Sequence, residues 1–170
     1  KAEAIIGIED NKPKAIDALS FECNGNNRIN VMPLSTRYPQ GGERRLISSV
    51  TGRQINSHIL PADAGVIVLN IATIIAIFEA VKMNMPLVHR VVTLTGDGIN
   101  EPGNMDVPLG ISHKYLADEC GGIKDSTVKI ISGGPMMGMA MNSLDYPVIK
   151  TSSSILAITH DDVEKMEISA

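Results

Sequence analysis

The chain has 170 residues, which suits one ordinary domain or two small domains packed together. With 44% hydrophobic and 20% charged residues, its composition is typical of a soluble globular protein. Only 3% of the residues are aromatic and the net charge is −4. Both values argue against a nucleic-acid-binding protein, which needs stacking side chains and a basic face.

The N-terminal part predicts alternating strands and helices. Residues 2–8 (AEAIIGI) have the continuous apolar centre of a strand that is covered on both faces. Leu46, Ile47 and Val50 at helical spacing before Gly52 predict a helix with a glycine just past its end. The expected elements are strands at 2–8 and 28–34 and helices at 13–19 and 43–51. This βαβα order implies a parallel sheet with right-handed crossovers.

Gly41 and Gly42 lie between the second strand and the second helix. At such a junction the bare backbone can approach a ligand and the first helical N–H groups lack partners, so the place suits an anion or a nucleotide-like ligand. Arg44 and Arg45, in the first turn, set positive charge against the helix dipole. The alternative is a tight turn before a surface helix, because one glycine pair is a weak signal.

The next stretch predicts a third strand at 65–69 (GVIVL) and then an amphipathic helix from Ile71 to about Asn84. Asn70 is a good N-cap for this helix. Thr73 lies in the same first turn, so the two side chains and the free N–H groups offer a place for a phosphate. Asn70 has the simpler alternative of capping its own helix.

Pro86 marks a change to β-rich sequence. The expected elements are strands at 88–95, 107–111, 128–132 and 152–158, a turn region at 96–104, and a helix at 113–120 between Ser112 and a Gly-Gly pair. The order ββαβ is that of a β-grasp unit, a small sheet with one helix across it. We therefore expect an α/β region at 1–85, an α+β domain at 86–158 and a charged tail at 159–170.

The turn GGPMMG at 133–138 has an unusual density of methionine. Flexible thioethers either fill a gap at a packing surface or offer a soft contact surface to a partner. Both interpretations fit the sequence. The second predicts a docking surface on which Met136 and Met137 are exposed.

Cys23 and Cys120 lie far apart, so they predict neither a disulfide framework nor a zinc or iron–sulfur site built from these cysteines alone. The four histidines are scattered, and no nucleophile–base pair or Walker motif is visible. The longest apolar stretch, 66–81, is too short and too polar to span a bilayer. The sequence therefore predicts no catalytic residue, no metal site and no membrane span.

Several segments in a fixed order belong to one protein family. They are IGIEDNKP at 6–13, YPQGGERRLI at 38–47, TGR at 51–53, LPAD at 60–63, VTLTGDGINEPGNMDVPLG at 92–110 and GGPMMG at 133–138. Over nearly its whole length the chain resembles the RnfC family, which supplies one subunit of the Rnf electron-transport complex. Members of that family combine a flavin- and NADH-binding domain, similar to the flavin subunit of respiratory NADH dehydrogenase, with a β-grasp domain of the SLBB type and a ferredoxin-like segment.

The resemblance implies a partial Rossmann-like flavin domain followed by an SLBB-type β-grasp domain. It also implies electron transfer through FMN and a pair of 4Fe–4S clusters in a complex that couples electron flow between ferredoxin and NAD to ion pumping. RnfC is the peripheral, NADH-facing member at the cytoplasmic face of the cell membrane. The implied partners are NADH and the membrane and iron–sulfur subunits, so the chain is expected to be a component of an NAD(H)-dependent oxidoreductase and translocase.

The resemblance also assigns site residues. Gly41, Gly42 and Glu43 match a Gly-Glu-Glu loop beside the flavin, with Glu43 near the nicotinamide nucleotide. Gly42 replaces the first glutamate, so one polar contact is lost. The segment from Asn70 to Thr73 matches the Asn-Val-x-Thr turn at the FMN phosphate, and this favours the phosphate interpretation for both residues.

The sequence departs from the family pattern at both ends. The upstream glycine-rich flavin loop, the segment that lines the isoalloxazine ring and the downstream cysteine-rich segment are not found, and the chain begins without Met. We therefore expect a fragment of the subunit that holds no cofactor tightly and is inactive alone. Two other interpretations stay open: a non-catalytic docking or ligand-binding module, and a fragment of a cobalamin-reductase-like flavoprotein.

Overall fold

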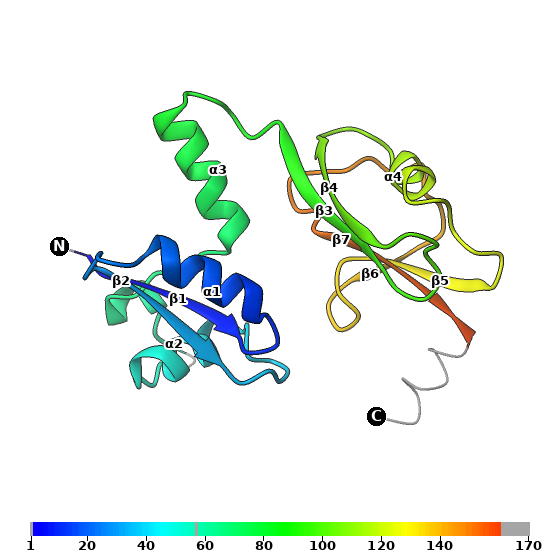
Figure 1. Ribbon diagram of the computed structural model, residues 1–170. Coiled ribbons are helices and arrows are strands. Elements are labelled where there is room, and N and C mark those ends of the chain that lie inside the picture. The colour runs from blue at the N-terminus through cyan, green and yellow to red at the C-terminus, as the bar shows by residue number, and fades with distance from the viewer. Residues whose placement is uncertain (1, 57, 161–170) are drawn as a thin grey trace. The chain divides into compact units, whose positions relative to one another are not determined.

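The structure, a computed structural model, describes residues 2–56 and 58–160. The chain divides into two compact units between Leu69 and Asn70 (Figure 1). The domain boundary expected at residues 85–86 stays a prediction. The charged tail expected at 159–170 lies, from residue 161 on, outside the described residues.

The first unit is built on a two-stranded parallel sheet. Its elements are β1 (Ala4–Glu9), α1 (Pro13–Glu22), β2 (Ile29–Leu34), α2 (Glu43–Thr51) and the 3-10 helix η1 (Pro61–Ala64). The two strands pair in register from Ala4 opposite Ile29 to Glu9 opposite Leu34. This pairing confirms the predicted parallel βαβα arrangement, in which α1 runs past its expected end at Leu19.

Helix α2 packs against the sheet through one face. Ile47 is fully buried, and a Cβ atom built on Gly7 of β1 would stand only 2.9 Å from Leu46 Cδ1 and 3.0 Å from Leu34 Cδ1. Glycine in β1 therefore allows the helix to approach the strand closely. The helix ends as predicted, because Gly52 has a φ of 70° and its N–H donates to the Ser48 carbonyl at 2.9 Å.

Two predictions for this unit are wrong. β1 is not covered on both faces, since Ala4, Ile5 and Gly7 are exposed. Residues 65–69 do not form a strand, and Ile67 is 78% exposed. A strand forms only where a neighbouring strand pairs with its backbone N–H and C=O groups, and the described sheet of this unit consists of β1 and β2 alone.

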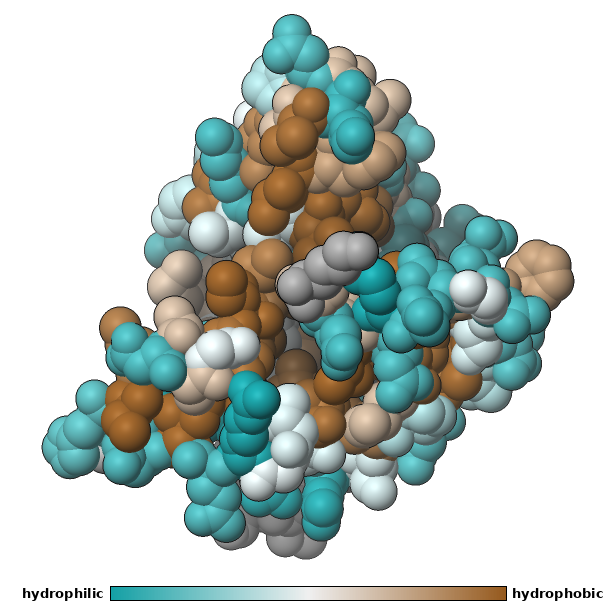
Figure 2. Space-filling model, turned by 90° about the vertical axis from the view of Figure 1, so that its left-hand side faces the viewer, coloured by the Kyte–Doolittle hydropathy of each residue, from teal (hydrophilic) through white to brown (hydrophobic). Residues whose placement is uncertain are grey.

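Helix α3 (Ile71–Lys82) begins the second unit and confirms the helix predicted after Asn70. All of α3 is described and none of its residues is buried; Ile71, Ile75 and Phe78 are 55%, 52% and 56% exposed. Figure 2 shows broad brown areas of apolar side chains on the face turned to the viewer. Within residues 2–56 and 58–160, no helix combines the length and the apolar character needed to cross a membrane.

The rest of the second unit is a five-stranded sheet with one helix packed on it. Its elements are β3 (His89–Thr95), β4 (Gly103–Pro108), α4 (His113–Glu119), β5 (Thr127–Ser132), β6 (Met139–Met141) and β7 (Ser154–Thr159). The strand order is β4-β3-β7-β5-β6, with β3 and β7 parallel and the other neighbours antiparallel. Leu116 of α4 and Cys120, just past the end of α4, share one buried cluster with Leu94 and Ile155 of the sheet. This arrangement confirms the predicted β-grasp fold.

Strand bounds in this unit differ from those predicted. β4 begins at Gly103, inside the expected turn region, because pairing with β3 draws in Gly103 opposite Leu94. The sequence does not predict β6, which pairs with β5 through Met141 opposite Ile130. Met136 and Met137 are 65% and 84% exposed, so the interpretation that they fill a gap in the core is wrong.

Candidate functional site

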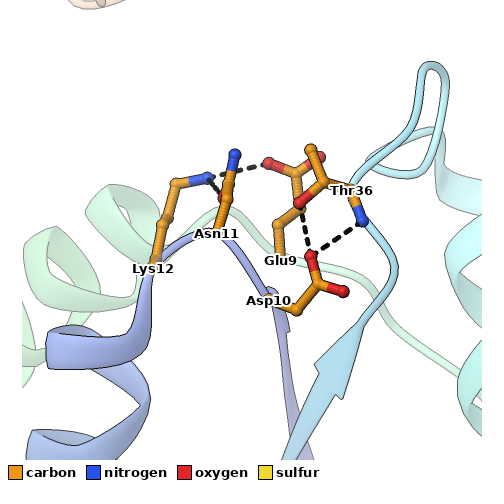
Figure 3. A network of polar contacts seen from close by, with 5 residues as sticks. All are labelled: Glu9, Asp10, Asn11, Lys12 and Thr36. Carbon is orange, nitrogen blue, oxygen red and sulfur yellow. Dashed lines mark hydrogen bonds and ion pairs between the residues drawn. The ribbon is translucent and has the colours of Figure 1, made fainter.

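The carboxyl ends of β1 and β2 lie side by side because the two strands are parallel. In open α/β sheets this edge is where ligands bind. Glu9, Asp10, Asn11 and Lys12 follow one another at the end of β1, and Thr36 lies just beyond β2 (Figure 3). These side chains form the polar rim of the candidate site.

Hydrogen bonds tie the rim together. Lys12 Nζ donates to Glu9 Oε2 at 2.8 Å and to Asn11 Oδ1 at 2.9 Å. Asp10 Oδ1 accepts from the Thr36 hydroxyl at 2.6 Å and from the Thr36 N–H at 3.1 Å (Figure 3). The Thr36 hydroxyl and N–H hold the pKa of Asp10 below its usual value by favouring the carboxylate. The loop after β2 is therefore anchored to the end of β1 by a charged acceptor.

Gly41, Gly42 and Glu43 lie at the N-terminus of α2, as predicted. Gly42 is the N-cap residue, and no side chain of the described residues caps this helix. A Cβ atom built on Gly41 would meet nothing within 4 Å, so its backbone faces open space. Glu43 is exposed in the first turn, where its negative charge favours the helix dipole.

Arg44, in the first turn of α2, bonds to the chain that follows the helix. Its guanidinium donates to the backbone carbonyls of Ile55, at 3.3 Å, and of Asn56. The arginine thus holds the chain that follows α2.

A small pocket lies beside this junction. It has a volume of about 310 Å³ and is lined by Gly7, Ile8, Glu9, Lys12, Leu34, Gln40, Gly41 and Leu46. Gln40 is 4% exposed, and its Nε2 donates to Ser49 Oγ at 3.0 Å. Its Oε1 is buried and accepts no hydrogen bond from the described part of the chain. A residue with one unpaired acceptor thus lines this pocket together with the bare backbone of Gly41, a combination that suits a ligand edge with an N–H group.

The sequence gives Gln40 and Asp10 no role, although both lie in segments that carry the family resemblance. Gln40 is recognisable only once it is seen buried with one unpaired atom. The partner of Asp10 is Thr36, 26 positions away, which no local motif predicts.

Asn70 and Thr73 lie in the first turn of α3. Asn70 Oδ1 accepts the N–H of Ala72 at 2.9 Å, which confirms the capping role. This bond uses only the carbonyl oxygen, so the amide Nδ2 can still donate to an anion. Thr73 is exposed in the same turn. Gly41 to Glu43 belong to the first unit and Asn70 and Thr73 to the second, and each segment is described within its own unit.

Two family models match the chain. The Nuo51 FMN-binding domain matches residues 1–79, a range that includes both segments above, and the SLBB domain matches residues 91–140.

Curated relatives match along most of the chain. It is 50% identical over 161 residues to the RnfC subunit of the proton-translocating ferredoxin:NAD(+) oxidoreductase complex of Clostridium ljungdahlii. It is 42% identical over 162 residues to the corresponding subunit of the Na(+)-translocating complex of Acetobacterium woodii, and 38% identical over 161 residues to that of the ion-translocating oxidoreductase complex of Yersinia enterocolitica. Each alignment covers 95% of this chain but only 35%, 37% and 23% of the respective relative. The chain thus spans about a third or less of the length of these relatives.

Proposed function

This chain is homologous along 95% of its length to the RnfC subunits of ion-translocating ferredoxin:NAD(+) oxidoreductase complexes, and we propose that it forms part of the NADH-facing subunit of such a complex. In this role the subunit passes electrons between NAD(H) and ferredoxin through FMN and iron–sulfur clusters. The observation that carries the proposal is the pair of exposed helix N-termini, at Gly41 to Glu43 and at Asn70 to Thr73, inside the match to an FMN-binding domain.

The residues of the second N-terminus fit the phosphate of FMN. The Asn70 amide Nδ2, the Thr73 hydroxyl and the first N–H groups of α3 are all donors, and the helix dipole favours a negative charge at this end. Asn70 therefore has two compatible roles, because its oxygen caps the helix while its nitrogen faces a ligand. The capping bond also orients the amide for that second contact.

The first N-terminus fits the flavin ring or the nicotinamide nucleotide. Gly41 leaves the backbone open, Glu43 supplies an exposed carboxylate, and Gln40 Oε1 supplies a buried acceptor. When bound, FMN supplies the chemistry of accepting a hydride and releasing its electrons singly. The chain's own residues would bind and orient it.

The remaining parts of the proposal follow from the relatives' names and the family resemblance. We propose that a pair of 4Fe–4S clusters belongs to other parts of the subunit, that NADH and the membrane and iron–sulfur subunits are its partners, and that it lies at the cytoplasmic face of the membrane. Exposed Met136 and Met137, together with Met139 at 76% exposure, are proposed to form the docking surface toward those subunits, since exposed methionines adapt to protein contacts.

Replacing Thr73 with valine in the full-length subunit should weaken FMN binding while leaving the fold intact. The change removes the hydroxyl at nearly constant volume, and a hydrogen bond to a charged phosphate contributes about 1.5–3 kcal/mol, so the Kd should rise roughly ten- to hundredfold. The measurement is the flavin content and the FMN dissociation constant of the purified protein.

Thr73→Ser keeps the hydroxyl and is the matched control, which should retain FMN. Asn70→Ala is less informative, because losing the cap costs about 1 kcal/mol of helix stability with or without a ligand. Unchanged FMN affinity in Thr73→Val would show that Asn70 and Thr73 have only structural roles.

A further inference from the structure

A second, larger pocket lies in the β-grasp sheet region of the second unit. Its volume is about 940 Å³, within the range of small-molecule sites. Its wall includes His113, Met137, Met139, Met141, Asn142 and Tyr146. Among the described residues that line it, there is no Asp, Glu, Lys or Arg. None of the residues assigned to FMN lines this pocket, whereas Met137 and Met139 also belong to the proposed docking surface.

Glycines shape the turn that forms one side of the pocket. A Cβ atom built on Gly138 would stand 2.4 Å from Ile131 Cγ2 and 2.6 Å from the Gly134 carbonyl oxygen, so only glycine fits there. Gly133 has a φ of 106° and lies against Gly138. Its N–H donates to the Ser154 carbonyl at 2.8 Å, which ties the turn to β7. The backbone of the turn and its bond to β7 therefore shape this side of the pocket.

His113 supplies one buried polar group of the pocket wall. The residue is 3% exposed, and its Nδ1 lies 2.6 Å from the Tyr146 carbonyl oxygen. A carbonyl only accepts, so Nδ1 carries a proton, and in the neutral form of imidazole Nε2 is then the acceptor. Nε2 is buried and has no hydrogen-bond partner in the described part of the chain. A buried acceptor of this kind is normally satisfied, and here a donor must come from outside the described residues.

The surroundings of His113 define the chemistry of that donor. The lack of charged side chains among the described residues of the wall favours an uncharged ligand, because a charge would be desolvated without a partner. Methionine sulfur packs favourably against aromatic rings, and Met137, Met139 and Met141 line the same space as Tyr146. The flexible thioethers can also adapt their shape to a bound ring.

We propose that this pocket binds an uncharged aromatic compound that donates one N–H or O–H hydrogen bond to Nε2 of His113. The aromatic ring lies among the methionines, and the donor satisfies the buried nitrogen that lacks a partner within the described residues.

Two isomeric probes test the proposal on the full chain. 3-Methylindole has an N–H donor, whereas 1-methylindole has the same composition and nearly the same shape without one. Titrations followed by the backbone amide NMR signals of Ala140 and Asn142 should show that 3-methylindole binds about tenfold more tightly, the usual effect of one net hydrogen bond. Equal affinity for the two isomers, or no binding of either at millimolar concentration, would overturn the proposal.

Three variants test whether 3-methylindole binds in this pocket and through His113. His113→Asn places a side-chain N–H near the Tyr146 carbonyl but removes the Nε2 acceptor, so the preference for 3-methylindole should vanish. Ala140 is an exposed residue of β6 that lines the pocket, so Ala140→Phe puts a ring there and should abolish binding. Val128 is an exposed residue of β5 outside the pocket lining, so Val128→Phe should not abolish binding. If His113→Asn fails to fold, Ala140→Phe and Val128→Phe still show where the probe binds. Binding that survives Ala140→Phe would place the probe outside this pocket and overturn the proposal.

Discussion

Replacement of Gly96 with alanine should unfold the β-grasp sheet of the second unit. Gly96 has a φ of 104°, and a Cβ atom built there would stand 2.0 Å from the carbonyl oxygen of Ala157. That carbonyl cannot easily retreat, because Ala157 is fully buried and its oxygen accepts the Gly98 N–H at 3.1 Å. Backbone strain of about 1–2 kcal/mol and overpacking of about 1–3 kcal/mol or more together approach the whole stability of a small domain.

Gly110→Ala is the matched control for this prediction. Gly110 also has a positive φ, of 93°, but nothing lies within 4 Å of its built Cβ atom. In this variant the free energy of unfolding should fall only by the cost of backbone strain, about 1–2 kcal/mol. Urea unfolding followed by the amide NMR signals of β7 reports on this unit alone. Equal destabilisation by the two substitutions would show that the contact with Ala157 is not the cause.

The double substitution of Met136 and Met137 by glutamate should release the subunit from the assembled complex while leaving the chain folded. Both side chains are largely exposed, at 65% and 84%, so a charge there costs the free chain little. In a packed interface the same charges would be buried without partners, at a cost of several kcal/mol. The measurement is the amount of the full-length protein that remains with isolated membranes after washing.

A charge elsewhere on the same unit separates docking from a general effect of charge. Val128 is 46% exposed and does not lie in the methionine-rich turn, so Val128→Glu should leave the subunit attached. If the methionine double variant stays on the membrane, Met136 and Met137 are not part of the docking interface. Loss of its folded NMR spectrum would show that the two methionines support the fold after all.

Helix ends that carry a capping residue are predicted well from the sequence, because each depends on one or two local residues, whereas α1, which has no such signal at its end, runs past Leu19. Gly52 adopts the left-handed conformation expected of a residue just past a helix, and Asn70 forms the expected cap. Both effects are local, so nothing distant in the chain needs to be known.

Strands are predicted less well because each depends on a partner. The run at 65–69 has the composition of a strand but pairs with no neighbour among the described residues, whereas Gly103 and Asn104 look like a turn and pair with β3. Sequence patterns describe apolar content, and pairing depends on segments far along the chain.

The roles of the polar groups in both pockets cannot be predicted from the sequence either, because they too depend on residues that are distant along the chain. His113 is positioned by the backbone carbonyl of Tyr146, 33 residues away, and any residue type supplies a carbonyl. Gln40 matters through one buried oxygen that lacks a partner within the described chain, which is a property of packing rather than of residue type. The family resemblance, in contrast, points directly to Gly41 to Glu43 and to Asn70 and Thr73, because those residues lie in motifs.

Binding of the FMN phosphate at the N-terminus of α3 is the step on which the proposed function depends most directly. Titrating the chain with FMN and, separately, with riboflavin tests this step, since riboflavin lacks only the phosphate. The proposed site predicts that millimolar FMN shifts the amide NMR signals of Ala72 and Thr73 and that riboflavin leaves both unchanged. Equal shifts with the two flavins, or no shift of these signals with FMN, would contradict it.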